Sequence, residues 1–337
     1  MNAGAAFDDE SQASVRTPPD LAPRSRAGRL LSIVAPMHDE APVLEAFFTR
    51  IDAALAPLGV ESEIICVDDG SREATLTGLV ERARRDPRVK VIALARNFGK
   101  EAALTAGIEA ARGDMVVPID ADLQDPPELI AEFVRLWESG YDVAYGARSD
   151  RSSDTALKRT TARLFYSVFN RVADLGIPAS AGDFRLMDRQ VVEALKLLPE
   201  RNRFMKGLFA WVGFRQIGVP YVRPQRAAGT TSMGYLRLWR FAIDGITSFS
   251  TAPLRVWTGV GLIAALMALA GAVAVVIRVL IAGRDVPGYA SLMVVILIST
   301  ALQMVAFGVL GEYVGRLYQE VKGRPIYVVR ARIGFDG

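Results

Sequence analysis

The sequence predicts an α/β fold with a mainly parallel sheet, followed by interfacial amphipathic helices and a two-helix transmembrane hairpin. Three observations support this prediction. Short apolar runs alternate with longer amphipathic segments through the first part of the 337-residue chain. Two long uncharged segments lie near the C-terminus, and acidic residues end three of the apolar runs. We therefore expect a polar site on the sheet, close to a lipid surface.

The apolar runs have the length of buried strands and are bounded by polar or turn-forming residues. They cover residues 30–36, 62–69, 89–95, 114–120 and 141–147. The amphipathic segments between them cover residues 40–55, 72–85, 99–112 and 126–139. Continuous apolar strands that alternate with helices are typical of a parallel sheet covered on both faces. Such a sheet binds its ligands beyond the carboxyl ends of the strands.

Two uncharged segments are long enough to cross a bilayer as helices. Residues 256–277 and 286–311 carry no charge, which gives runs of 22 and 26 residues. A helix of about 20 residues spans about 30 Å of hydrocarbon. We expect a transmembrane hairpin over residues 253–311, with spans at about 256–280 and 288–311. A helix pair buried in a soluble core is the alternative.

The rest of the chain divides by composition. Residues 1–28 contain no apolar run, which fits a disordered tail and not a signal peptide. Residues 29–232 hold the alternating pattern and form the expected main domain. Residues 233–252 predict a juxtamembrane amphipathic helix, with an ordinary helix packed on the domain as the alternative. Residues 312–337 are expected to form a cytoplasmic C-terminal tail.

Basic residues flank the two spans on one side of the predicted hairpin. They are Arg237, Arg240, Arg255, Arg316, Lys322, Arg324, Arg330 and Arg332. The connecting turn offers only Arg284, which Asp285 opposes. The positive-inside rule therefore predicts a multi-pass protein of the inner (cytoplasmic) membrane, with both termini and the main domain in the cytoplasm.

The counts of reactive side chains exclude several kinds of site. One cysteine, Cys66, excludes an internal disulfide and a zinc site built on several cysteines. One histidine, His38, excludes paired-histidine metal sites and disfavours a Ser-His-Asp arrangement. The net charge of +3 is too small to indicate nucleic acid as a partner. The chemistry must then rest on carboxylates and arginines, with or without a metal ion.

Acidic residues follow the fourth apolar run in the stretch "DADLQDPPE". Asp120 and Asp122 are two apart, so their side chains share one face if the backbone stays extended. Such oxygen ligands suit Mg²⁺ or Mn²⁺, which bind one or two carboxylates and take further ligands from substrate phosphates. Gln124 could add an oxygen. Asp125, which precedes two prolines, could instead cap the next helix.

The second apolar run also ends in acidic residues, in the stretch "VDDGS". Asp68 or Asp69 could accept hydrogen bonds from a nucleobase or from ribose hydroxyls. Gly70 would let the backbone approach such a ligand closely. The alternative is a strand-to-helix turn that Ser71 caps.

Four basic residues could meet phosphate groups. Arg96 and Lys100 follow the third apolar run, Arg148 ends the fifth, and Arg226 lies in a stretch rich in glycine and threonine. Arginine binds phosphate through a bidentate fork. For Arg96 and Lys100, solvated surface charge is the alternative.

The chain resembles glycosyltransferase family 2 through eight motifs in order: "VAPMHDE", "VDDGS", "RNFGKEAAL", "DADLQDPPE", "GAR", "GDFRLM", "RAAGTTS" and "DGITSFSTAPLR". The resemblance covers about residues 30–330. It looks most like the polyprenyl-phosphate glycosyltransferases, particularly the bactoprenol glucosyltransferases, with dolichol-phosphate mannose synthases more distant. It implies a GT-A (Rossmann-like) catalytic domain, a nucleotide-sugar donor, a divalent metal and a polyprenyl phosphate acceptor.

The resemblance and the residue patterns together give three sets of expected site residues. Binding of the nucleotide and its diphosphate is expected from Pro36, Glu40, Asp68, Asp69, Arg96, Lys100, Asp120 and Gln124. The expected metal ligands are Asp120, Asp122 and Gln124. The expected catalytic residues are Asp122, Arg148, Asp183 and Arg226. The motif after Gly229 lacks the lysine of many relatives, whose phosphate contact Arg223 could supply.

The expected reaction needs no strong general base. A phosphate ester is already anionic at neutral pH, so the main tasks are to align it with the sugar's C1 and to neutralise the departing diphosphate. A single displacement inverts the anomeric centre. Asp183 is the candidate for orienting the sugar hydroxyls or the acceptor, and pairing with Arg185 is the alternative.

We therefore expect inverting transfer of a hexose, most simply glucose from UDP-glucose, to polyprenyl (undecaprenyl) phosphate at the cytoplasmic face of the membrane. The alternatives are another sugar, a non-lipid acceptor such as a growing polysaccharide, or a non-catalytic membrane scaffold. Glycines in both spans could let helices pack closely. Relatives suggest a homo-oligomer, with a tetramer as the favoured form.

Overall fold

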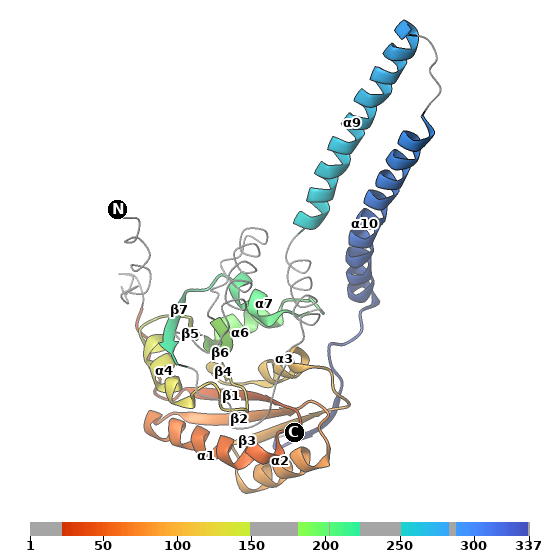
Figure 1. Cartoon of the computed structure of the whole chain (residues 1–337). Coiled ribbons are helices and arrows are strands. Elements are labelled where there is room, and N and C mark those ends of the chain that lie inside the picture. Colours follow the sequence, from red (N-terminus) through yellow and green to blue (C-terminus); the bar gives the residue numbers. More distant parts are fainter. Residues whose placement is uncertain (1–21, 149–180, 202, 223–250, 283–287, 336–337) are drawn as a thin grey trace, which may run out of the picture.

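The computed structural model describes residues 22–148, 181–201, 203–222, 251–282 and 288–335. In this part of the chain, one eight-stranded sheet carries helices on both faces, and two long helices project from it (Figure 1). Four of the seven strand pairings are parallel. The predicted α/β class with a mainly parallel sheet is confirmed.

The first five strands form where the apolar runs predict them. They are β1 (Leu30–Met37), β2 (Glu61–Asp68), β3 (Val89–Leu94), β4 (Met115–Pro118) and β5 (Val143–Arg148). The helices between them are α1 (Leu44–Leu55), α2 (Glu73–Arg85), α3 (Lys100–Ala110) and α4 (Ile130–Glu138). Short 3₁₀ turns precede or follow the helices: η1 (Ala41–Val43), η2 (Ala56–Leu58) and η3 (Pro127–Leu129).

The later elements complete one end of the sheet. They are β6 (Ala181–Asp188), α6 (Arg189–Lys196), α7 (Met205–Trp211) and β7 (Gln216–Tyr221). The strand order is β7-β5-β6-β4-β1-β2-β3-β8. β1 pairs in parallel with both β2 and β4, so the chain order reverses there and the carboxyl ends of these strands share one edge. β6 runs antiparallel between β4 and β5, which brings its first residues to the same edge.

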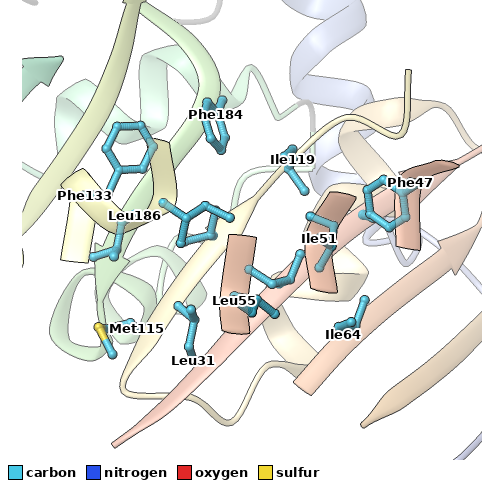
Figure 2. Packing of buried hydrophobic residues seen from close by; sticks show 14 of the residues in the cluster. Leu31, Phe47, Ile51, Leu55, Ile64, Met115, Ile119, Phe133, Phe184 and Leu186 are labelled. Atoms are coloured by element: carbon cyan, nitrogen blue, oxygen red, sulfur yellow. The ribbon is translucent and has the colours of Figure 1, made fainter. Parts of the chain in front are cut away.

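The core lies on both faces of the sheet. α1, α2 and α4 cover one face, where the side chains shown in Figure 2 pack together. α3, α6 and α7 cover the other face. On the first face the rings of Phe133 in α4 and Phe184 in β6 lie with their centroids 4.9 Å apart. Because successive side chains of a strand point to opposite faces, the buried Phe184 holds its neighbour Asp183 toward the α3 side.

Two long helices, α9 (Ala252–Ala282) and α10 (Tyr289–Lys322), lie side by side away from the sheet (Figure 1). Both are long and apolar enough to cross a membrane, and none of their apolar stretch is buried inside the protein. The alternative of a helix pair in a soluble core does not fit this exposure. Most of the predicted juxtamembrane helix, residues 233–250, lies outside the described residues.

The C-terminal segment differs from the expected tail. α10 continues to Lys322, and β8 (Val329–Ile333) then pairs antiparallel with β3. Tyr327 also donates a hydrogen bond to Glu109 in α3, over 2.5 Å. Without β8, β3 would be an edge strand with unpaired backbone groups, which is the physical reason for this addition.

The end of the expected N-terminal tail also contacts the domain. Arg24 donates to the backbone oxygen of Tyr141 over 2.8 Å and forms an ion pair with Asp142 at 2.5 Å. Residues 1–21 lie outside the described part of the chain.

Candidate functional site

A cavity of about 300 Å³ opens at the carboxyl edge of the sheet, between the loops that follow β1, β2, β3 and β4. Six of the expected site residues line it: Pro36, Glu40, Asp69, Lys100, Asp120 and Asp122. The reversal of chain order between β1 and β4 lies directly beneath it. The structure therefore brings the acidic strand ends together, as the fold class predicts.

The loops after β2 and β3 are locked to each other. Gly70 has φ of +64°, and a Cβ there would lie 2.4 Å from the backbone carbon of Arg96, so only glycine fits. The Asp69 carboxylate accepts hydrogen bonds from the backbone nitrogens of Phe98, at 2.7 Å, and Gly99, at 2.9 Å. Asp69 thus shapes the wall of the cavity.

Asp68 and Ser71 complete the same turn. Asp68 is buried and accepts a hydrogen bond from the backbone nitrogen of Ser71 over 3.3 Å. The Ser71 hydroxyl accepts from the backbone nitrogen of Asp39 at 3.0 Å, and no side chain caps α2. The expected alternative, a helix cap by Ser71, is wrong, because this hydroxyl instead joins the loop after β2 to the loop after β1.

Lys100, the first residue of α3, joins two aspartates across the cavity. Its ammonium nitrogen lies 2.7 Å from Asp120 Oδ1 and 2.8 Å from Asp183 Oδ2. The expected alternative for Asp183, an ion pair with Arg185, does not form. Arg185 is buried instead against the ring of Phe209, at 3.9 Å, and donates to the backbone oxygen of Gly182 over 2.7 Å.

The carboxyl groups near Lys100 differ in pKa. Burial alone would raise the pKa of Asp183, but the charges of Lys100 and Lys206 lower it to about 2. Burial and the nearby Asp183 raise the pKa of Glu101 to about 7. Asp183 Oδ1 and Glu101 Oε2 are both buried and have no hydrogen-bond partner among the described residues. Buried acceptors of this kind are rarely left unpaired.

The loop after β4 contains a strained residue. Leu123 has φ of +57°, which is unusual for a bulky side chain. The turn lets Asp122 Oδ1 accept a hydrogen bond from the backbone nitrogen of Gln124 over 3.1 Å. Backbone strain of this kind gathers at functional loops. Gln124 itself does not line the cavity.

The described residues can supply part of the coordination of the metal expected from the sequence. No group of three or more acidic, histidine or cysteine side chains is close enough to hold an ion within the described ranges. Asp120 and Asp122 both line the cavity, so the protein offers two carboxylates there. This set suits Mg²⁺ or Mn²⁺ that completes its coordination with substrate phosphates and water.

The expected basic residues are spread more widely. Arg148 ends β5, and its Nη2 would lie 3.7 Å from a Cβ placed on Gly182, the neighbour of Asp183. Arg96 is exposed, lies over the ring of Phe98 at 4.3 Å and does not line the cavity. Arg226 and Arg223 lie outside the described residues.

Two further residues line the cavity: Asn97, which was not singled out from the sequence, and His38, which lies in the stretch from Pro36 to Glu40 expected to contact the nucleotide. Asn97 Nδ2 lies 3.2 Å from His38 Nε2, and His38 Nδ1 lies 2.9 Å from the backbone oxygen of Asp69. An amide NH₂ can only donate, so this pairing assigns the ring proton to Nδ1. Asn97 stands inside the motif "RNFGKEAAL", which was the available signal.

The comparisons with known proteins match both parts of the chain. The family described as Glycosyl transferase family 2 matches residues 32–196, and the one described as GtrB C-terminal hairpin matches residues 252–317. An uncharacterized glycosyltransferase of Synechocystis sp. is 53% identical over 306 residues, which is 91% of this chain and 96% of the relative. The chain belongs to glycosyltransferase family 2. The resemblance read from the motifs is confirmed, and the protein is a glycosyltransferase.

Other relatives of this family 2 glycosyltransferase carry more specific names. A protein of Shigella flexneri named SfII prophage-derived bactoprenol glucosyl transferase is 45% identical over 300 residues, 89% of this chain and 97% of the relative. A solved mannosyltransferase from Pyrobaculum calidifontis, in complex with GDP-Man and Mn²⁺, is 23% identical with a TM-score of 0.45 and covers 67% of this chain and 64% of that one. The hairpin match coincides with α9 and most of α10, so the enzyme associates with a membrane.

Proposed function

We propose that this family 2 glycosyltransferase transfers glucose from UDP-glucose to polyprenyl phosphate, with inversion at the anomeric carbon. The observation that carries the proposal is the cavity lined by Asp120 and Asp122 in a domain joined to an apolar hairpin. The relative named bactoprenol glucosyl transferase supports the sugar and the lipid, because this chain covers 97% of its length.

The carboxyl edge of the sheet is proposed to bind the diphosphate of the nucleotide-sugar donor. Asp120 and Asp122 would hold Mg²⁺ or Mn²⁺, which neutralises charge on the leaving diphosphate when bound. Pro36, Glu40 and Asp68 belong to the loops proposed to enclose the nucleotide. Lys100 lines the cavity, and its ammonium, which pairs with Asp120 and Asp183, would exchange a carboxylate for a donor phosphate.

The acceptor supplies its own nucleophile. A phosphate monoester is ionised at neutral pH, so the protein has to orient it rather than deprotonate it. Asp183, whose Oδ1 is buried without a partner in the described part of the chain, would orient sugar hydroxyls, and Arg148 would meet a phosphate of the acceptor or donor. Arg226 is proposed to provide a second phosphate contact.

The proposed topology keeps the catalytic domain and both termini in the cytoplasm. The basic residues that flank the spans on one side support this orientation. The phosphate of an embedded prenyl lipid would then stand at the same membrane face as the nucleotide sugar. Glycines on both spans support close helix packing and a homo-oligomer, for which we propose a tetramer.

The test is an assay with purified enzyme, undecaprenyl phosphate, Mn²⁺ or Mg²⁺ and a panel of nucleotide sugars, with the glycolipid followed by mass spectrometry. We expect one metal-dependent product, from UDP-glucose. Asp122→Ala should lower kcat/KM at least about 100-fold, because it removes a carboxylate at the charged leaving group. Glu128→Gln is the matched control, since Glu128 is exposed and binds only Arg50 in the described structure.

Two results would contradict the proposal. Release of nucleoside diphosphate without glycolipid would identify the acceptor as wrong. A product from another donor, with none from UDP-glucose, would correct the sugar while leaving the reaction class in place.

A further inference from the structure

Three side chains from separate parts of the sheet form a chain of hydrogen bonds next to the cavity. Tyr221, the last residue of β7, donates its phenolic O–H to Asp125 Oδ1. The Tyr221 hydroxyl oxygen in turn accepts a hydrogen bond from the guanidinium of Arg148. Tyr221 stands opposite Arg148 in the parallel register of β7 and β5, and Asp125 comes from the loop after β4. Tyr221 and Asp125 are both buried.

This arrangement corrects the reading of Asp125 as a helix cap. The residue before η3 is Pro126, and no side chain caps that turn. Asp125 is the third aspartate of the stretch "DADLQDPPE" and does not line the cavity. Its carboxylate is used by Tyr221, which lies beyond residue 196, where the match to the transferase family ends.

The single proton of the Tyr221 phenol determines which groups donate and which accept in this chain of hydrogen bonds. A tyrosine hydroxyl has a single proton, and here Asp125 receives it, so the oxygen can only accept from Arg148. Burial, followed by the charge of Asp125, raises the pKa of Tyr221 to about 12. The phenol therefore keeps its proton at neutral pH, and its oxygen presents a lone pair to the Arg148 guanidinium.

The position of the Tyr221 ring is also fixed by its packing. A Cβ on Gly146 would lie 2.8 Å from Cε1 of Tyr221, which is too close for any side chain. Glycine on β5 thus leaves the space that the ring fills. The hydroxyl is held between a packed ring and a buried carboxylate, so it is a rigid partner for Arg148.

The Arg148 side chain lies next to the segment of β6 that carries Asp183. Its Nη2 lies close to Gly182, one residue before Asp183, and its Nε is buried with no hydrogen-bond partner among the described residues. A long arginine side chain has many rotamers. A fixed hydrogen-bond partner already restricts them, so less conformational entropy is lost when the guanidinium binds an anion.

We propose that Asp125 and Tyr221 are positioning residues, which aim the guanidinium of Arg148 at a phosphate of the bound substrates. The proposal rests on the proposed function, which gives Arg148 a phosphate to meet. Asp125 and Tyr221 touch neither substrate; they act through Arg148.

The experiment compares Tyr221→Phe, Arg148→Ala and the double variant in the full-length enzyme, with kcat and KM measured separately for nucleotide sugar and for lipid phosphate. Tyr221→Phe keeps the ring and removes the hydroxyl, so kcat/KM should fall about 10-fold, as for a lost hydrogen bond to a charged group. In the Arg148→Ala background the same change should have no further effect, because the residue it positions is gone. The substrate whose KM rises identifies the phosphate.

Tyr145→Phe is the matched control, because Tyr145 lies on β5 next to Gly146 and has no place in this chain of bonds; it should keep wild-type kcat/KM. Asp125→Asn repeats the cycle if Tyr221→Phe fails to fold. The proposal is overturned if Tyr221→Phe leaves kcat/KM unchanged, or if the loss recurs in full without Arg148. No glycolipid from the wild-type enzyme would instead overturn the proposed function.

Discussion

The sheet contains two clusters in which a lysine meets carboxylates, and they differ in how completely their hydrogen bonds are made. The first joins Lys90 on β3 to Glu63 on β2, inside the α3 side of the sheet. The second joins Lys100 to Asp120 and Asp183 at the carboxyl edge. Each centres on a lysine ammonium paired with carboxylate, so the comparison concerns how exposed these groups are and how many of their oxygens have a partner.

The Lys90 cluster is closed. Glu63 Oε1 accepts from the Ser32 hydroxyl at 2.5 Å and from the backbone nitrogen of Arg112 at 2.7 Å, while Oε2 accepts from Lys90. The side chains of Lys90 and Glu63 are only 5% and 4% exposed. Every acceptor of the carboxylate is used, and no ligand can reach it. This cluster serves the fold.

The Lys100 cluster is open. The Lys100 side chain is 44% exposed, and those of Asp120 and Asp183 are 27% and 17% exposed. Asp183 Oδ1 is buried without a partner in the described part of the chain. The open cluster is therefore the one proposed to bind substrate, while the closed cluster is proposed to serve the fold alone.

The largest expected effect is a loss of stability when the Lys90 cluster is disrupted. Lys90→Met should lower the free energy of unfolding by about 3 kcal/mol, because it removes the nearest counter-charge of the buried Glu63 and leaves only the Arg112 guanidinium, 3.7 Å away and 60% exposed. Urea unfolding of the detergent-solubilised enzyme, followed by its tryptophan fluorescence, would measure it. Adding Glu63→Gln should recover part of the loss. Unchanged stability in Lys90→Met would remove the distinction between the two clusters.

The open cluster should respond in activity and much less in stability. Lys100→Met is expected to lower kcat/KM at least about 10-fold, since it removes a cation from the proposed diphosphate site. The free energy of unfolding should change by less than about 1 kcal/mol, because water already screens these charges. Parallel kinetic and urea measurements on Lys100→Met and Lys90→Met test the contrast. A stability loss equal to that of Lys90→Met would contradict it.

The smallest expected effect is on how the stability of the fold depends on acidic pH. Burial would raise the pKa of Glu63, but the hydrogen bonds from Lys90, Ser32 and the Arg112 backbone lower it overall. The ionised carboxylate therefore stabilises the fold at neutral pH, and this contribution is lost as the pH falls below about 4. Unfolding midpoints of Glu63→Gln should depend less on acid than those of the wild type.

The control for this pH series is Glu132→Gln, which removes an exposed carboxylate that pairs with Arg135 on its own helix. It should alter the acid dependence less than Glu63→Gln does. Equal pH dependence of the wild type and Glu63→Gln would show that the closed cluster does not contribute to acid stability.

The sequence by itself determined the features that depend on neighbouring residues. Five strands and four helices follow from short-range periodicity, and the two long helices follow from uninterrupted apolar stretches. The gathering of Asp69, Asp120 and Asp122 at one edge also follows, because parallel strands place their carboxyl ends together.

Only the tertiary structure decided which residues complete the site. β6 enters between β4 and β5, so Asp183 reaches Lys100 across 83 residues of sequence. Tyr221 reaches Asp125 across 96 residues, and β8 returns from the hairpin to pair with β3. These contacts depend on the order of the strands in the sheet, and no periodic pattern in the local sequence indicates that order. The physical reason is that local propensity fixes what each segment becomes, while burial of the whole sheet selects which segments lie side by side.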